Sequence, residues 1–260
     1  MLNNRGIRRA GAAGRLALVL LLPALSLPAS SARALEWHRE AALPATSMES
    51  VRRVDGTLYV GGSDRVYVGA NDGATWSATA PLGSDGAPIY TALPAGGALW
   101  AAAATVGVFR SGDGGQHWAP VNTGLTGLGA TDVAQFALKG TGLYAATLGA
   151  GVFRLDLGDP TRWSAFNAGL PVSVAGNVST IVLNGTTLLA PAGGNGYVYR
   201  FPEGAAEWQE TAVRPPILAG FQATDLAGDG THLLVASPSS VYRSVDDGQT
   251  WAPADAGLPN

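Results

Sequence analysis

The chain has 260 residues, no cysteine and a formal net charge of −3. Without cysteine it can form neither disulfides nor thiolate metal sites, and a lipidated N-terminal cysteine is excluded. All 19 acidic residues follow position 34, where they meet 11 basic residues and give a net charge of −8. We therefore expect no nucleic-acid partner and no attraction to anionic membranes.

The first element in chain order is a predicted secretory signal peptide over residues 1–34. Four arginines precede an apolar stretch over 16–27, and Ala32 and Ala34 supply the small residues that a signal peptidase needs. A membrane anchor is the alternative, but the apolar run is shorter than the ~20 residues that span a bilayer. Arg8 and Arg9 lack the bulky apolar residues typical after a twin-arginine pair. We expect export by the general route to the periplasm or medium of a bacterium, without membrane insertion after cleavage.

Residues 35–260 show an internal repeat, marked by tryptophans with gaps of 39, 42, 45, 45 and 43 residues: Trp37, Trp76, Trp118, Trp163, Trp208 and Trp251. A constant interval of this length is typical of one four-stranded propeller blade. The predicted units are 37–76, 77–118, 119–163, 164–208 and 209–260. The predicted fold is a single all-β domain, a β-propeller of about five four-stranded blades.

Other positions of the repeat agree with this frame. Each unit has a strand that begins with leucine, as at Leu99 and Leu143, and a later strand with an aromatic residue, as at Phe109 and Phe153. No long segment after the signal peptide shows helical periodicity. A four-stranded blade cannot cover both of its faces, so blades stack around an axis and bury one another.

Two predicted hairpins carry the pattern Ser-x-Asp-x-Gly-x-x-Trp. A third copy is degenerate, with asparagine in the aspartate position. The motif residues are Ser111, Asp113, Gly115 and Trp118; Ser244, Asp246, Gly248 and Trp251; and Asn71, Gly73 and Trp76. The pattern resembles the Asp-box of bacterial neuraminidase (BNR) repeats, and the resemblance covers nearly the whole chain after the signal peptide.

The chemistry of the box is local. An aspartate can accept hydrogen bonds from backbone N–H groups in a tight turn, and glycine tolerates the positive φ that such a turn requires. We interpret Asp113 and Asp246 as turn formers. A catalytic carboxylate or a calcium ligand is the alternative, but calcium needs several more oxygen ligands nearby. We expect neither metal nor cofactor.

The resemblance leaves the activity open, because Asp-box families include sialidases, xyloglucanase-type glycoside hydrolases, sortilin-like receptor domains and exported photosystem II assembly propellers. A sialidase would have an arginine triad and a Phe/Tyr-Arg-Ile-Pro segment, and we find no such segment. One repeated position holds Arg110, Arg154, Arg200 and Arg243, which indicates a structural role or a solvated edge and not a single binding site. Asp132 and Asp225 lie outside the box pattern and remain candidate carboxylates for glycoside hydrolysis.

We expect an exported, non-catalytic scaffold or assembly module that binds a protein or glycan at one mouth of its axial channel. The candidate binding residues, taken as a group, are Arg52, Arg53, Tyr90, Gln135, Thr180 and Asp225. The alternative is a glycoside hydrolase with a reduced propeller. Trp37, His38 and Arg39 resemble a sixth outer strand beside five sets of inner strands. One terminus must then pair unusually, or the propeller is completed by self-association.

Overall fold

The computed structural model describes residues 47–70, 73–171, 176–191, 197–211, 225–237 and 240–256. The signal segment, Trp37, His38, Arg39 and Asn71 lie outside these ranges. Every regular element within them is a β-strand, so the predicted all-β class is confirmed. The described residues include no helix of the length and apolarity needed to cross a membrane.

The strands form five antiparallel sheets of four, each joined in chain order. The first three sheets are β1(Ser50–Val54), β2(Thr57–Gly61), β3(Val66–Ala70), β4(Thr75–Ala78); β5(Ile89–Ala95), β6(Ala98–Ala103), β7(Gly107–Ser111), β8(Ala119–Pro120); and β9(Val133–Lys139), β10(Gly142–Thr147), β11(Gly151–Asp156), β12(Trp163–Ala165). The last two are β13(Val182–Asn184), β14(Thr187–Pro191), β15(Val198–Phe201), β16(Gln209–Glu210); and β17(Asp225–Gly228), β18(Leu233–Ala236), β19(Val241–Ser244), β20(Ala252–Pro253).

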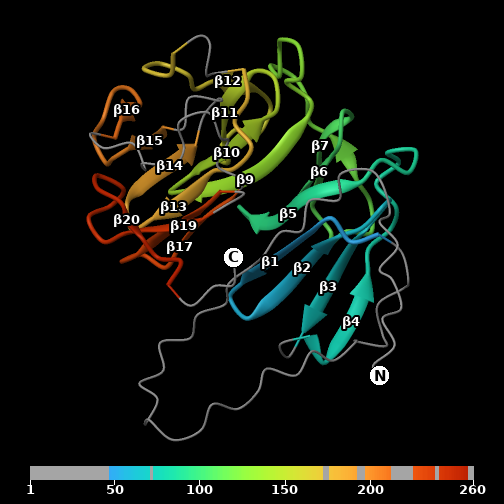
Figure 1. Cartoon of the computed structure of the whole chain (residues 1–260). Coiled ribbons are helices and arrows are strands. Elements are labelled where there is room, and N and C mark those ends of the chain that lie inside the picture. Colours follow the sequence, from blue (N-terminus) through green and yellow to red (C-terminus); the bar gives the residue numbers. More distant parts are fainter. Residues whose placement is uncertain are drawn as a thin grey trace, which may run out of the picture.

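The five sheets are the blades of a propeller. They follow one another around a common centre in chain order (Figure 1). The first strand of each blade is the inner one, since β1, β5, β9, β13 and β17 contact one another in that sequence. The predicted five-bladed β-propeller is therefore confirmed. Each fourth strand begins at or beside a repeat tryptophan, which places these residues at the outer edge.

The hydrophobic core lies between blades. Between the second and third blades, Leu93 and Trp100 pack with Phe136, Phe153 and Trp163, all at most 3% exposed. Alanines fill the second strands, next to the inner ones, where Ala101, Ala102, Ala145 and Ala146 are fully buried. Small side chains here let neighbouring backbones approach closely, and the large rings fill the wider space farther out.

Candidate binding mouth

Four of the six candidate residues lie at the start of inner strands. Tyr90 is the second residue of β5, Gln135 the third of β9 and Asp225 the first of β17, and Thr180 lies two residues before β13. All inner strands run in the same direction, because every blade has the same antiparallel order. Their starts therefore meet at one end of the channel, which we call the mouth.

The mouth carries one polar residue per blade at an equivalent position of the inner strand. Cross-strand pairing places Ser50 opposite Gly61, Thr91 opposite Ala102, Gln135 opposite Ala146 and Asp225 opposite Ala236. Thr180 precedes Val182 by two residues, as Asp225 precedes Ala227, and completes the set. We call Ser50, Thr91, Gln135, Thr180 and Asp225 the polar column.

Sequence reasoning missed two members of the polar column, Ser50 and Thr91. It selected Tyr90 instead of Thr91, but Tyr90 lies at a register shift in the pairing of β5 with β6 and has no cross-strand partner. An extra residue of this kind is a β-bulge, which redirects the side chain of the bulged position. A register shift also occurs where β9 pairs with β10. Hydrophobic alternation does not reveal such a bulge.

Side chains of the polar column bind neighbouring blades. The Thr180 hydroxyl donates to Oε1 of Gln135, and the backbone N–H of Ile181 donates to the same oxygen over 2.9 Å. On the first blade, Ser50 Oγ donates to the carbonyl of Ile89 on the second blade over 3.2 Å. These bonds hold the polar groups in fixed positions at the mouth.

Asp225 is the acidic member of the polar column. Burial raises the pKa of its carboxyl group, against the smaller opposing effects of the Leu226 N–H, which donates over 2.8 Å, and of the nearby Thr180 hydroxyl. Desolvation disfavours the charged form of a carboxylate, so the direction of the shift follows from the half-buried position. The fifth blade thus holds a carboxyl group that is costly to ionise.

Replacement of Asp225 by asparagine should leave the protein as stable or more stable at pH 7. A raised folded pKa means that ionisation penalises the native state, and that acid relieves the penalty. The advantage of Asp225→Asn should therefore shrink as pH falls through the folded pKa, in urea unfolding measured from pH 7 to 4.

Asp229 provides a control in which the pKa shift has the opposite direction. Hydrogen bonds from the His232 N–H and ring, and from the Thr231 N–H, lower the pKa of Asp229 to about 2. A lowered folded pKa contributes stability at neutral pH that is lost as pH falls through it. Asp229→Asn should therefore destabilise at pH 7. A loss of stability in Asp225→Asn at pH 7 would contradict the assigned burial.

Neither candidate arginine lies at the mouth. Arg52 lies deeper in the channel, and Arg53 lies farther along β1. Arg52 crosses from β1 to the third blade, where its Nη1 donates to the carbonyl of Phe136 over 2.6 Å. Burial lowers the pKa of Arg52. At its register position the other blades carry only apolar residues: Leu93, Ala137, Val182 and Ala227. Arg53 is exposed and lies towards the opposite end of β1 from the mouth.

The Asp-box hairpins lie at the end of the blades opposite the mouth, between third and fourth strands. In the second blade, the Ser111 hydroxyl donates to Asp113 over 2.7 Å and accepts from the Gly115 N–H over 2.8 Å. Asp113 also accepts from the N–H groups of Gln116 and His117, each over 3.0 Å. The fifth blade repeats the arrangement, with Ser244 bonded to Asp246 over 2.8 Å and Gly248 over 2.9 Å.

These hydrogen bonds explain the electrostatics of the box. The Ser111 hydroxyl, followed by the N–H and ring of His117, holds the pKa of Asp113 far below its usual range. Burial alone would raise the pKa of Asp246, but hydrogen bonds from Thr250 and Ser244 together lower it. A carboxylate whose lone pairs are occupied by its own turn stabilises that turn. In both boxes the aspartate thus accepts hydrogen bonds from its own turn.

Ser111→Ala should destabilise the protein by about 1–3 kcal/mol, because it leaves a buried N–H without its acceptor. Ser111 is 1% exposed, so water cannot replace the hydroxyl. The unfolding midpoint in guanidinium chloride measures the effect. Ser164→Ala is the control, since that hydroxyl is exposed and donates to the Arg154 carbonyl over 3.2 Å. Equal midpoints for the two variants would refute the role of Ser111.

Asp132 has a structural contact of its own. Its carboxylate accepts from the Thr105 N–H at 3.4 Å, and its backbone N–H donates to the Gly129 carbonyl at 3.1 Å. It thus joins the turn before β9 to the second blade. Across the described ranges, His, Asp and Glu side chains form no group of three that could hold a metal ion.

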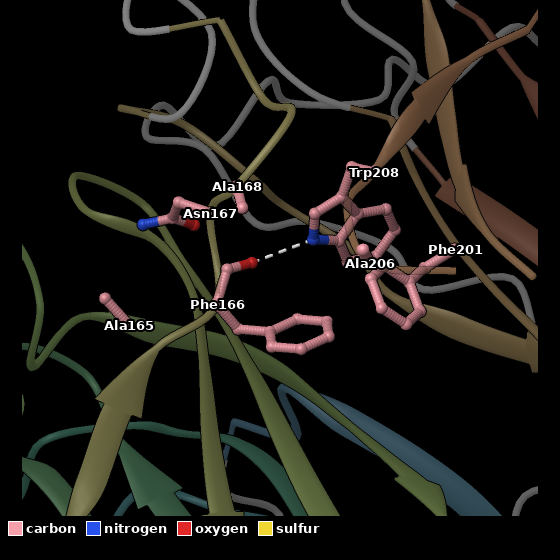
Figure 2. Close-up of a pocket in the computed structure, with 7 residues that line it drawn as sticks. All are labelled: Ala165, Phe166, Asn167, Ala168, Phe201, Ala206 and Trp208. Atoms are coloured by element: carbon pink, nitrogen blue, oxygen red, sulfur yellow. Dashed lines mark hydrogen bonds between the residues drawn. The ribbon is translucent and has the colours of Figure 1, made fainter. Parts of the chain in front are cut away.

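A small cavity of about 100 Å³ lies between the third and fourth blades, near their outer strands. Figure 2 shows its walls, where Phe166, Phe201 and Trp208 meet. Phe166 and Phe201 pack with ring centroids 4.7 Å apart. The Trp208 indole donates across the cavity edge to the Phe166 carbonyl over 2.8 Å, as the dashed line marks. The cavity is a gap between blades whose walls are mainly aromatic and alanine residues.

The hydrogen bond from the Trp208 indole recurs between other pairs of blades. Trp163 Nε1 donates to the Val121 carbonyl over 2.8 Å, and Trp118 Nε1 donates to the Ala80 carbonyl over 3.2 Å. In each case the acceptor belongs to the preceding blade, just after its fourth strand. We call this contact the indole staple. Sequence reasoning missed it, because a backbone carbonyl leaves no residue signature.

Solved structures share this propeller fold. A complex of YCF48 with a D1 peptide matches with a TM-score of 0.60 and 15% identity, over 82% of this chain and 69% of that chain. The extracellular domain of BT4673 from B. thetaiotaomicron matches with a TM-score of 0.62 and 13% identity, over 80% of this chain and 28% of that chain. The GH74 xyloglucanase from Xanthomonas campestris matches with a TM-score of 0.56 and 20% identity, over 76% of this chain and 36% of that chain.

The chain thus spans about a third of the BT4673 domain and of the xyloglucanase. No family model and no curated protein sequence matches it. At these identities the similarity establishes the fold, and the resemblance to Asp-box propellers is consistent with it.

Proposed function

We propose that the protein is an exported, non-catalytic scaffold that binds a protein ligand at the mouth. The observation that carries the proposal is the polar column, which brings one polar side chain from each of the five blades to the same end of the channel. Propellers with unrelated ligands use such convergent inner-strand ends, because every blade contributes to one small surface.

The chemistry of the mouth supports recognition of polar backbone groups. Gln135 and Ser50 offer partly exposed amide and hydroxyl groups held by hydrogen bonds, and Thr180 is buried behind Gln135. Tyr90 adds a half-buried ring on a bulge. Aromatic and adaptable polar side chains together are typical of protein-binding surfaces. YCF48, whose solved complex holds a D1 peptide, shows that one propeller of this fold binds a polypeptide.

A glycoside hydrolase is the second candidate function, favoured by one observation. Asp225 has a raised pKa from burial, as a general acid would, and a xyloglucanase shares the fold. Glycoside hydrolysis needs a second carboxyl group opposite the first. Asp132 is instead engaged with the Thr105 N–H and lies outside the polar column. Turnover of xyloglucan or sialosides that Asp225→Ala or Asp132→Ala abolishes would establish this candidate and overturn the scaffold.

Site-specific photocrosslinking tests the scaffold directly. A photoreactive amino acid at position 90 lies at the mouth, and the same group at Thr141, in the exposed β9–β10 turn at the opposite end, is the matched control. We expect one discrete protein adduct from position 90 in exporting cells, and none from position 141. Equal adducts from both positions, or none from either, would contradict the proposal.

A further inference from the structure

Arg52 places a positive charge at a register position that is apolar in every other blade. It lies two residues beyond Ser50 on β1, about 7 Å deeper than the polar column at the usual rise of a strand. Its Nη1 crosses to the third blade and donates to the Phe136 carbonyl over 2.6 Å. The guanidinium is therefore a feature of this channel and not of the repeat.

Most of the hydrogen-bonding capacity of Arg52 is unused. A guanidinium donates hydrogen bonds from each of its nitrogens, and among the described residues only the Phe136 carbonyl accepts from Arg52. The other nitrogens are not sealed from solvent, because none of them belongs to the buried polar atoms that lack a partner. Arg52 therefore keeps donors that a molecule entering the channel can reach.

No carboxylate neutralises Arg52 within the described part of the chain. Arg65 and Arg200 form ion pairs with aspartates at 2.8 and 3.0 Å, whereas Arg52 forms none. Burial lowers the pKa of Arg52, and no nearby carboxylate opposes that shift, Asp225 of the polar column included. A desolvated cation without a counter-ion is costly, and a bound anion relieves that cost.

Gln135 supplies a second set of donors one residue away from the Phe136 carbonyl. Its Oε1 accepts from the Ile181 N–H over 2.9 Å and from the Thr180 hydroxyl. A backbone N–H can only donate, so these contacts determine which end of the amide is oxygen. The NH2 group of Gln135 is then the free end, with no acceptor among the described residues. Guanidinium and NH2 groups donate only, which is the complement of a carboxylate.

We propose that Arg52, together with the Gln135 NH2 group, receives a carboxylate of the protein ligand. This inference rests on the proposed binding of a protein at the mouth, and it adds the chemical group that the channel selects. Polypeptides present a carboxylate on Asp and Glu side chains and at the C-terminus. Arginine binds it through two parallel N–H bonds, and the contact of Nη1 with Phe136 leaves Nε and Nη2 for that purpose.

NMR of the arginine side chains tests the carboxylate site before the ligand is known. With isotope-labelled arginine, the Nε–H signal that is missing from Arg52→Lys identifies Arg52. The probes are N-acetyl-glutamate N-methylamide for a side chain and N-acetyl-glycine for a chain end, each titrated at constant ionic strength. We expect a saturable shift of the Arg52 signal with at least one probe, and the probe that responds identifies the source of the carboxylate.

The neutral N-acetyl-glutamine N-methylamide is the control for the titration and should leave the Arg52 signal unchanged. An absence of saturable shifts with both carboxylates, or an equal shift with the glutamine compound, would overturn the inference.

Photocrosslinking at position 90 separates this inference from the proposed function. Arg52→Gln should lower the yield of the adduct about tenfold or more, because a hydrogen bond between charged groups is lost. Arg52→Lys should give an intermediate yield, since lysine keeps the charge without the paired donors. Arg162→Gln removes the same charge from an exposed residue at the opposite end and should keep the parental yield.

The outcomes are distinguishable. An undiminished adduct in Arg52→Gln would refute the carboxylate site and leave the scaffold standing. No adduct in the parent would refute the scaffold and, with it, the carboxylate of a protein ligand, whatever the NMR titration shows for small carboxylates.

Discussion

Trp163→Ala should be the most damaging single substitution that we can name in this fold, with a loss of about 3–5 kcal/mol. The indole is 1% exposed and stacks on Phe136 with centroids 6.4 Å apart and planes 7° from parallel. It also donates to the Val121 carbonyl over 2.8 Å. Truncation would therefore open a cavity between the second and third blades and leave the Val121 carbonyl without its hydrogen-bond donor.

Thermal unfolding followed by circular dichroism measures this loss, which should lower the melting temperature by roughly 6–20 °C for a domain of this size. Trp163→Phe separates the two contributions, because it keeps most of the ring but removes the N–H donor. It should lose about 1–3 kcal/mol from the orphaned acceptor and imperfect packing. A melting temperature within 2 °C of the parent for Trp163→Ala would contradict the assignment of Trp163 to the interblade core.

Asp247→Ala should destabilise the junction of the fourth and fifth blades by about 2–4 kcal/mol, because it leaves a poorly hydrated arginine without its partner. Asp247 accepts from Arg200 over 3.0 Å, from Thr187 over 2.5 Å and from Asn184 over 3.3 Å. The Arg200 side chain is only 16% exposed, and its Nε has no partner among the described groups. Urea unfolding measures the loss.

Asp156→Ala is the matched control for Asp247. Arg154 holds the same repeat position as Arg200, but its ion pair with Asp156 is 3.6 Å long and half exposed. Exposed pairs of this kind contribute about 0–1 kcal/mol. Similar losses for the two variants would show that Asp247 does not join the blades.

The blade number could be predicted from sequence because burial recurs with the repeat. Trp118, Trp163 and Trp208 mark one outer edge after another, and each blade needs the same apolar anchor there. The box turns could be predicted for a different reason. Their hydrogen bonds join residues two to four positions apart, as between Ser111 and Asp113, so the local sequence contains the whole interaction.

Contacts between blades were beyond prediction. The partners of Asp247 lie 47 to 63 positions earlier in the chain, and Asp247 fills a variable position of the box pattern. Its positive φ of 59°, unusual for a residue other than glycine, has no sequence signature either. At the repeated arginine position, Arg200 forms an ion pair between blades, whereas Arg243 is exposed.

The candidate mouth was predicted as a group of residues, not as a geometry. Tyr90, Gln135, Thr180 and Asp225 share an end of the inner strands because the blade topology repeats. Arg52 crosses the channel, which depends on the blade opposite it in space and could not be derived from one strand. Trp37 and Asn71 lie outside the described residues, so the predictions made for them stay predictions.

Hydrogen exchange with and without the ligand captured at position 90 tests the central claim most directly. If the polar column is the binding surface, the bound protein should exchange more slowly in peptides that cover the inner-strand starts, 89–92, 133–136 and 225–227. The box hairpins over 112–117 and 245–250 should keep their rates. Protection confined to those hairpins, with inner strands unchanged, would show that the protein binds through its opposite end.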